Sequence, residues 1–207
     1  MAQNGLSPLA AGTVAIGTVV GAALIGGRSS PTPDHPRTRR WYRGLEKPGF
    51  TPPPPAYAVA WTGIQAGLAV GGYRLLRRSP SPRRRLALAL WAVNQAAIAG
   101  WSEVFFGHRA PGAGTLVAGA MIGTSIGYVA SAAREDEVAA AAGVPLVAWV
   151  SFATLLAEEI WRRNDEPDPL HNGRGRSTSR RAALINLGSG AVLRGRADEG
   201  RGRPCRR

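Results

Sequence analysis

The chain has 207 residues, a length typical of one domain or at most two. It carries 26 Lys and Arg against 13 Asp and Glu, a formal net charge of +13, and its mean hydropathy of -0.09 is ordinary for a soluble basic protein. The single cysteine, Cys205, excludes an intrachain disulfide framework and a cysteine metal cluster.

The charged residues are distributed very unevenly, however. Charge-free stretches alternate with arginine-rich connectors, and each charge-free region can be extended to a helix of the roughly 30 Å needed to cross a bilayer. The pattern predicts an all-α integral membrane protein, a bundle of five transmembrane helices. The five predicted spans are residues 6–26, 56–76, 86–106, 111–133 and 138–161.

The first span, residues 6–26, also has the length of a signal peptide. A signal peptide carries positive charge ahead of its apolar run, and nothing basic precedes Arg28. We therefore interpret the span as a membrane helix that stays in the protein.

The first connector, residues 28–55, contains six basic residues and eight prolines. Four of these prolines are consecutive, from Pro52 to Pro55, which predicts a semi-rigid extended segment without helix. The other connectors are short, so neighbouring helices should run antiparallel. More basic residues fall on the side of the first connector than on the opposite side, which favours an outside amino terminus and an inside tail.

The last part of the chain differs from the rest. Residues 165–207 are rich in Arg, Gly, Ser and Pro, and their one apolar patch, residues 182–193, is too short to span a bilayer. We therefore divide the chain into a transmembrane domain, residues 1–164, and a basic tail expected to be disordered. The tail could bind phosphates nonspecifically, but it lacks interleaved aromatic residues, so we expect no specific nucleic-acid partner.

Small residues recur at intervals of four in the predicted spans, and such stripes let helix backbones approach closely. They leave two interpretations open, packing inside the bundle and a homodimer face. The stripes are Gly17 and Gly21; Gly63, Gly67 and Gly71; Ala92, Ala96 and Gly100; and Gly119, Gly123 and Gly127.

Polar and aromatic side chains inside the spans are the candidate ligand contacts. Asn94 and Gln95 lie in mid-span, where each amide needs a hydrogen-bond partner on another helix or on a ligand. Trp61, Trp101 and Trp149 could line a cavity for a flat ligand or simply pack. The sequence offers no metal-ligand spacing and no nucleophile with a paired base.

Several motifs in chain order resemble one family. Trp41-Tyr42-x-x-Leu45-Glu46-Lys47-Pro48-x-Phe50-x-Pro52-Pro53 is followed by Trp61-Thr62, Asn94-Gln95, Trp101-Ser102, Phe105-Phe106-Gly107, Pro145, Ala148-Trp149, Ser151-Phe152-Ala153-Thr154 and Ile160-Trp161-Arg162-Arg163-Asn164. Together these motifs resemble the TspO/MBR family, the bacterial tryptophan-rich sensory proteins and the mitochondrial translocator protein. The resemblance covers residues 6–164.

The resemblance implies a multi-pass receptor or transporter, usually a homodimer, in a bacterial cell membrane. It would bind protoporphyrin IX or haem-type tetrapyrroles and other hydrophobic ligands in a pocket between helices, with residues 28–55 folded over its mouth as a lid. By matching positions, Trp41 would belong to the lid, Trp61 and Asn94 to the pocket wall, and Ala153 to the fifth-helix wall, with Trp149 as a further ligand contact.

The resemblance also implies an alternative function. Bacterial members are linked to light-dependent porphyrin degradation that involves a tryptophan of the first loop, here Trp41, and a sensory regulator of tetrapyrrole metabolism is a related alternative. Because the chain offers no conventional catalytic constellation, we expect binding rather than catalysis. Vertebrate members carry a cholesterol-recognition tyrosine near the end of the fifth helix; Glu158 stands there, so we predict no sterol site.

Overall fold

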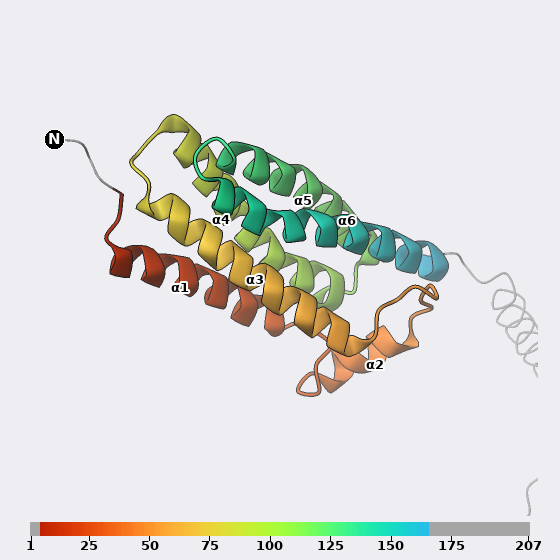
Figure 1. Ribbon diagram of the computed structural model, residues 1–207. Coiled ribbons are helices and arrows are strands. Elements are labelled where there is room, and N and C mark those ends of the chain that lie inside the picture. The colour runs from red at the N-terminus through yellow and green to blue at the C-terminus, as the bar shows by residue number, and fades with distance from the viewer. Residues whose placement is uncertain (1–4, 166–207) are drawn as a thin grey trace, which may run out of the picture. The chain divides into compact units, whose positions relative to one another are not determined.

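The computed structural model describes residues 5–165, and every regular element within that range is a helix (Figure 1). Residues 5–164 belong to one unit of the fold. The predicted tail, residues 165–207, lies outside the described residues except for Asp165, which ends α6. The elements are α1 (Pro8–Gly27), α2 (Pro36–Gly44), α3 (Pro54–Arg77), α4 (Pro82–Ser102), the π-helical turn η1 (Glu103–Gly107), α5 (Pro111–Ala132) and α6 (Glu137–Asp165).

Proline marks the start of most of these helices. Each of α1 to α5 begins at a proline, because proline fits the first turn, where its missing N–H has no intrahelical acceptor. Serine caps two of them: the Ser7 hydroxyl accepts from the Ala10 amide at 3.3 Å and the Ser81 hydroxyl from the Arg84 amide at 2.9 Å.

The first connector is more helical than the sequence indicates. It contains α2, inside a connector that we predicted to be extended, and Pro54 and Pro55 form the first turn of α3. The prediction that Pro52 to Pro55 stay outside any helix is therefore wrong at its second half. The same rule explains the error, since consecutive prolines can begin a helix although they cannot continue one.

Within residues 5–165, five helices have at least 20 residues each, and each overlaps one of the five predicted spans. Among the described residues, three of them are both long and apolar enough to cross a membrane: α1, α5 and α6, whose most apolar windows have mean hydropathies of 2.0, 1.4 and 1.9. The other two long helices carry buried or half-buried amides, Gln65 in α3 and Asn94 and Gln95 in α4.

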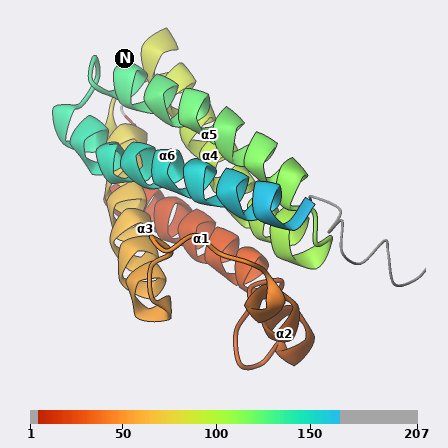
Figure 2. The ribbon, with the colours of Figure 1, turned by 90° about the vertical axis from the view of Figure 1, so that its right-hand side faces the viewer.

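The long helices pack side by side (Figures 1 and 2). α1 lies against α3 and α4, and α4 lies against α5. The indole Nε1 of Trp91 in α4 donates to the Leu68 carbonyl of α3 at 2.9 Å. Large apolar side chains also point outward, such as Leu9 at 81% exposed and Leu116 at 76%. Such an apolar exterior suits lipid as its surroundings.

α6 joins the bundle through close contacts with α3 and α5. A Cβ added at Gly67 would lie 2.6 Å from the Ala142 carbonyl oxygen, so the α3 and α6 backbones touch there. The Tyr128 hydroxyl of α5 donates to the Ala139 carbonyl of α6 at 3.1 Å. The Tyr128 side chain lies directly against both Gly71 and Gly143: an added Cβ would collide with its hydroxyl at Gly71 and with its ring at Gly143.

The small-residue stripes therefore serve packing inside the bundle only in part. Gly67 and Gly71 serve packing inside the bundle. By contrast, a Cβ at Gly63, Gly119 or Gly123 would meet no other atom of the described chain within 4 Å, and the same is true of Gly17 and Gly21. Those positions do not bring helices of the described chain together.

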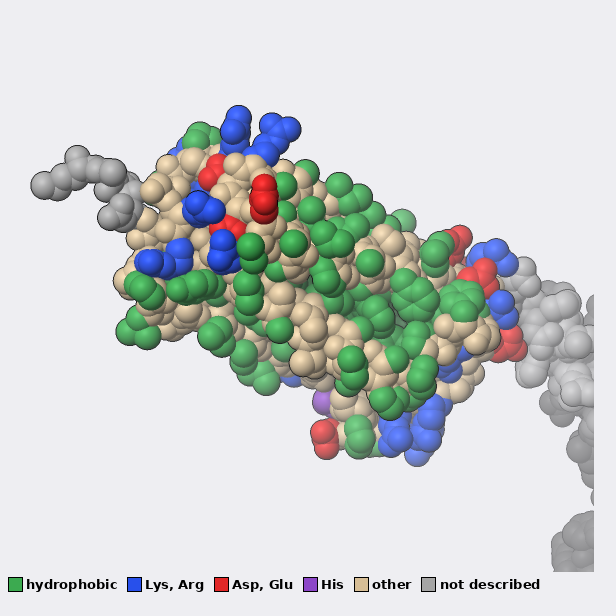
Figure 3. All heavy atoms as spheres, viewed as in Figure 1, with side chains coloured by type: hydrophobic (Ala, Val, Ile, Leu, Met, Phe, Trp, Pro, Cys, Tyr) green, Lys and Arg blue, Asp and Glu red, His purple; other side chains and the backbone are tan. Residues whose placement is uncertain are grey.

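Polar connectors occupy the two ends of the bundle. We call the end formed by residues 78–81 and 133–136 the connector end, and the end formed by α2, η1 and the last turn of α6 the lid end. On the face drawn in Figure 3, the charged side chains gather mainly at these two ends and the middle is largely hydrophobic.

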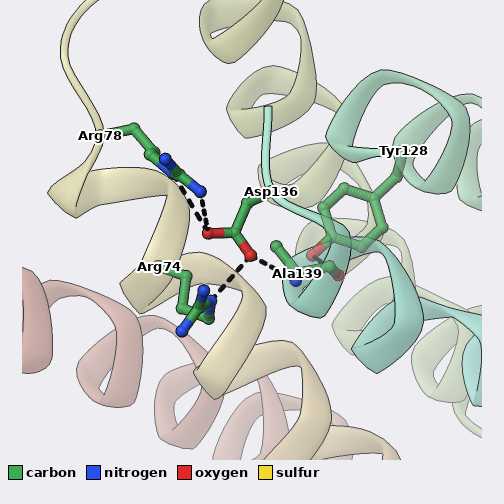
Figure 4. Close-up of polar contacts among 5 residues, drawn as sticks. All are labelled: Arg74, Arg78, Tyr128, Asp136 and Ala139. Atoms are coloured by element: carbon green, nitrogen blue, oxygen red, sulfur yellow. Dashed lines mark hydrogen bonds and ion pairs between the residues drawn. The ribbon is translucent and has the colours of Figure 1, made fainter. Parts of the chain in front are cut away.

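A buried carboxylate holds the connector end together (Figure 4). The Asp136 side chain accepts from Arg74 Nε at 2.7 Å, from Arg78 Nη2 at 2.9 Å and from the Ala139 amide at 3.0 Å. It thus caps the start of α6 and ties it to α3. Burial raises the pKa of Asp136, but the hydrogen bonds from Arg74, Ala139 and Arg78 outweigh this and hold it at about 2.

Candidate functional site

The lid end is built around aromatic side chains. Two consecutive residues of α2 face η1: the Trp41 ring centroid lies 6.3 Å from that of Phe105, and Tyr42 lies 5.4 Å from Phe106, both edge to face. Trp101 of α4 stacks on Phe105 at 4.9 Å. We call Trp41, Tyr42, Trp101, Phe105 and Phe106 the lid aromatic group.

The π-helical turn explains how adjacent phenylalanines join the same group. The His108 amide donates to the Glu103 carbonyl at 2.8 Å, a hydrogen bond one residue wider than in an α-helix. This wide turn presents both Phe105 and Phe106 to Trp101. The prediction of a regular helix through residue 106 did not include this turn.

A second aromatic group lies between α3 and α6. The Trp149 ring is 5.7 Å from Tyr57, 6.2 Å from Trp61 and 5.7 Å from Phe152. Phe50, just before α3, approaches Phe152 at 6.3 Å. We call Phe50, Tyr57, Trp61, Trp149 and Phe152 the central aromatic group, and half-buried Ala153 follows it directly on α6. Tyr57 and Phe152 also pack in the cluster that holds the lid group, so the two groups adjoin.

Cations flank the lid group. Lys47 Nζ lies 4.8 Å from the Tyr42 ring centroid and donates to the Leu45 carbonyl at 2.8 Å. The Arg109 guanidinium lies 6.0 Å from the Trp41 ring. Burial raises the pKa of the Tyr42 phenol and lowers the pKa of the Lys47 ammonium. Tyr42 therefore stays neutral at physiological pH.

A reciprocal amide pair fastens the lid to the end of α6. The Asn164 Oδ1 accepts from the Glu46 amide at 3.0 Å, and the Asn164 Nδ2 donates to the Glu46 carbonyl at 3.0 Å. We call this pair the lid latch. Residues 118 positions apart are thereby joined by both polar atoms of one side chain.

We expect Asn164→Ala to loosen the lid without unfolding the bundle. The variant loses two exposed hydrogen bonds, each worth roughly 0.5–1 kcal/mol. We therefore expect the amide-exchange rate at Glu46 to rise about tenfold. Hydrogen–deuterium exchange of the intact protein in detergent measures this change. Arg162→Ala is the matched control because Arg162, two residues earlier, pairs with Glu159 and contacts no lid residue among residues 5–165 through an ion pair or hydrogen bond. Equal loosening in both variants would contradict the latch.

The predicted pocket residues do not all meet. Trp61 and Trp149 lie together, with Ala153 next along α6, whereas Trp41 belongs to the lid group. Asn94 is 0% exposed: its Nδ2 donates to the Leu90 carbonyl and its Oδ1 accepts from the Thr124 hydroxyl, each at 2.9 Å. The interhelix hydrogen bond considered for Asn94 is thus present, and its ligand contact stays a prediction.

The neighbouring amide differs. Gln95 is 2% exposed, and neither its Oε1 nor its Nε2 has a hydrogen-bond partner within residues 5–165. The buried Oε1 of Gln65 is also unpartnered in that range. Unsatisfied buried polar atoms are costly, so these amides are candidate polar contacts for a guest molecule.

Two hollows, of about 310 and 410 Å³, lie at the connector end, and neither is lined by a member of either aromatic group. At the opposite end of the bundle, Asn164 fastens the lid to α6.

Sequence reasoning missed several of these residues. Tyr42, Tyr57, Phe152 and Asn164 were not among the predicted contacts, although three of them stand in the quoted motifs. Helical spacing would have indicated two of them, since Tyr57 lies four residues before Trp61 and Phe152 three after Trp149. The latch has no such signal, because its partner is a backbone distant in sequence.

The chain is similar in sequence to several known proteins. The chain is 28% identical to the translocator protein of Homo sapiens over 136 residues, which cover 63% of this chain and 78% of that protein. It is 30% identical to protein CrtK of Rhodobacter capsulatus over 132 residues (63% and 82%) and 28% identical to the tryptophan-rich sensory protein of Cereibacter sphaeroides over 124 residues (60% and 77%). The TspO/MBR family model matches residues 14–162.

These matches and the three apolar helices identify an integral membrane protein. Since the family match extends over most of the helical bundle and more than half of the chain, the chain belongs to the TspO/MBR family.

Proposed function

We propose that the protein spans a bacterial cell membrane with its five long helices and binds a tetrapyrrole, such as protoporphyrin IX or haem, between α3 and α6 beneath the lid. Its role would be that of a receptor or transporter. The observation that carries the proposal is the central aromatic group around Trp149, which adjoins the lid group. Flat aromatic walls suit a wide planar ligand.

The polar edge of such a ligand also needs partners. Gln95 has both amide atoms buried and unpartnered among the described residues, whereas Asn94 already bonds Thr124. Gln95 therefore supports the proposal better than Asn94. The ligand would enter when the lid latch opens and the rings of the two groups part.

We expect Trp149→Ala to weaken protoporphyrin IX binding about tenfold, because a flat ring stacked on an aromatic side chain gains roughly 1–3 kcal/mol. Trp61→Ala should act in the same direction. Titration followed by the shift of the porphyrin absorption band measures affinity without relying on tryptophan fluorescence. Trp161→Ala is the control, because this partly exposed indole contacts Gly112 and belongs to neither group; unchanged affinity in Trp149→Ala and Trp61→Ala would contradict the site.

Light-dependent porphyrin degradation is the second candidate function. It is favoured by the place of Trp41 in the lid, edge to face with Phe105 and beside Arg109. The same samples under illumination separate the two functions. Equal loss of porphyrin in wild type and Trp41→Phe would remove tryptophan-dependent degradation and leave binding alone.

We also propose a homodimer. Gly17 and Gly21 of α1 and Gly119 and Gly123 of α5 touch nothing else within the described part of the chain, and such stripes allow close contact with a second copy. Chemical cross-linking in native membranes distinguishes a dimer from a monomer.

A further inference from the structure

One hollow at the connector end differs from its surroundings in charge. It has a volume of about 310 Å³ and lies between the start of α4 and the end of α5. Its lining combines two arginines with a hydroxyl and two apolar side chains: Arg83, Arg134, Ser131, Leu86 and Ala130. No acidic residue lines it.

Both arginines are available to a ligand. Within residues 5–165, neither Arg83 nor Arg134 forms an ion pair. Of the other arginines nearby, Arg74 and Arg78 bind Asp136, and Arg84 donates to the Leu75 and Leu76 carbonyls. Arg85 also forms no ion pair within residues 5–165, but it does not line the hollow. Two unpaired guanidinium groups beside one hydroxyl are suited to a phosphate group.

The second hollow provides an internal comparison. It has a volume of about 410 Å³ and shares Arg134, but Glu135, Asp136 and Glu137 line it with Arg74 and Arg78. Its three arginines are thus balanced by three carboxylates. Only the first of these two hollows has an excess of positive charge.

Apolar side chains continue from the first hollow toward the middle of the bundle. Leu86 is 54% exposed, and Val93, seven residues further along α4, is 48% exposed on the same helix face. On α5, Ile126 is 51% exposed one turn deeper than Ala130. A ligand that filled the hollow with a phosphate could therefore lay a hydrocarbon chain along this surface.

We propose that this hollow binds the headgroup of an anionic phospholipid, with the phosphate between Arg83 and Arg134 and an acyl chain over Leu86 and Val93. Free phosphate carries the same kind of charge as the headgroup but has no acyl chain. The combination of paired basic groups with an exposed apolar track at a helix end favours the lipid. The site lies at the opposite end of the bundle from the lid and is independent of the proposed tetrapyrrole function.

Native mass spectrometry of the full chain in detergent tests the proposal, with phosphatidylglycerol and phosphatidylcholine of equal chain length as probes. We expect preferential binding of phosphatidylglycerol, weakened about fivefold by Arg83→Gln or by Arg134→Gln, the factor that corresponds to about 1 kcal/mol per basic residue. The matched control is Arg85→Gln: Arg85 is exposed, does not line the hollow and lies about 200° around α4 from Arg83.

Three results would overturn the proposal. Equal affinity for the two lipids would show that binding does not depend on an anionic headgroup. Equal weakening by Arg85→Gln would show attraction to overall charge rather than to this hollow. Displacement by glycerol phosphate at the concentration of the lipid itself would show that the acyl chain contributes nothing. Helix content and unfolding temperature of each variant confirm that the fold is intact.

Discussion

Asp136→Ala is expected to destabilise the protein by about 3 kcal/mol, because it removes a helix cap and charged hydrogen bonds. The loss is not larger because Arg74 and Arg78 are partly exposed. Asp136 is 4% exposed and joins α6 to α3 through Arg74 and Arg78. Its removal leaves the Ala139 amide without its cap. Denaturant unfolding in detergent, followed by helix content, measures the change.

The same carboxylate makes stability depend on acid. Because the pKa of Asp136 is lowered to about 2 in the folded protein, its contribution is present above the unfolded pKa and is lost as the pH falls to the folded one. We expect about 2 kcal/mol to disappear between roughly pH 4 and pH 2 in wild type. This loss of stability between pH 4 and pH 2 should be absent in Asp136→Asn.

Glu137→Gln is the control for both measurements. It removes the same charge one residue later, from an exposed side chain at the start of α6. A loss in Glu137→Gln as large as that in the Asp136 variants would mean that net charge, rather than the buried contacts, determines stability.

Gly67→Ala should cost about 2 kcal/mol, the size of an overpacking change in a well-packed interior. The new methyl group would lie 2.6 Å from the Ala142 carbonyl oxygen, and a backbone atom cannot rotate away as a side chain can. α3 and α6 would have to separate, which also disturbs the Trp61–Trp149 contact. The unfolding midpoint and porphyrin affinity should therefore fall together.

Gly63→Ala provides the comparison on the same helix. A Cβ there meets no atom of the described residues within 4 Å, and alanine is the better helix former, so stability should stay unchanged or rise by up to about 1 kcal/mol. If both substitutions destabilise equally, helix contact at Gly67 is not the reason.

Much of the bundle could be predicted from local chemistry. Charge-free stretches place the five long helices, and Pro8, Pro82 and Pro111 set three of their starts within a few residues of the predicted spans. The glycine spacing in α3 also indicated a packing face, which Gly67 and Gly71 form. These features depend on residues that are close together along the chain, so they can be predicted from a single sequence.

The site was less predictable because it depends on distant contacts. The α2 helix is short and mostly polar, and its place follows from Trp41 and Tyr42 docking on η1. Asn94 looked like a free mid-span amide until Thr124 of α5 proved to be its partner. Neither contact follows from residues that are neighbours along the chain.

The size of the Tyr128 side chain determines which residues fit at positions 71 and 143. Its ring fills the space that a side chain at Gly143 would need, and its hydroxyl fills the space at Gly71. The same hydroxyl reaches the Ala139 carbonyl, so α3, α5 and α6 meet at one phenol. Substitutions at these positions should therefore be tolerated as sets rather than singly. A protein that shortens residue 128 gains room for a methyl group at 71 or 143, and such compensating exchanges are the variation that this junction permits during evolution.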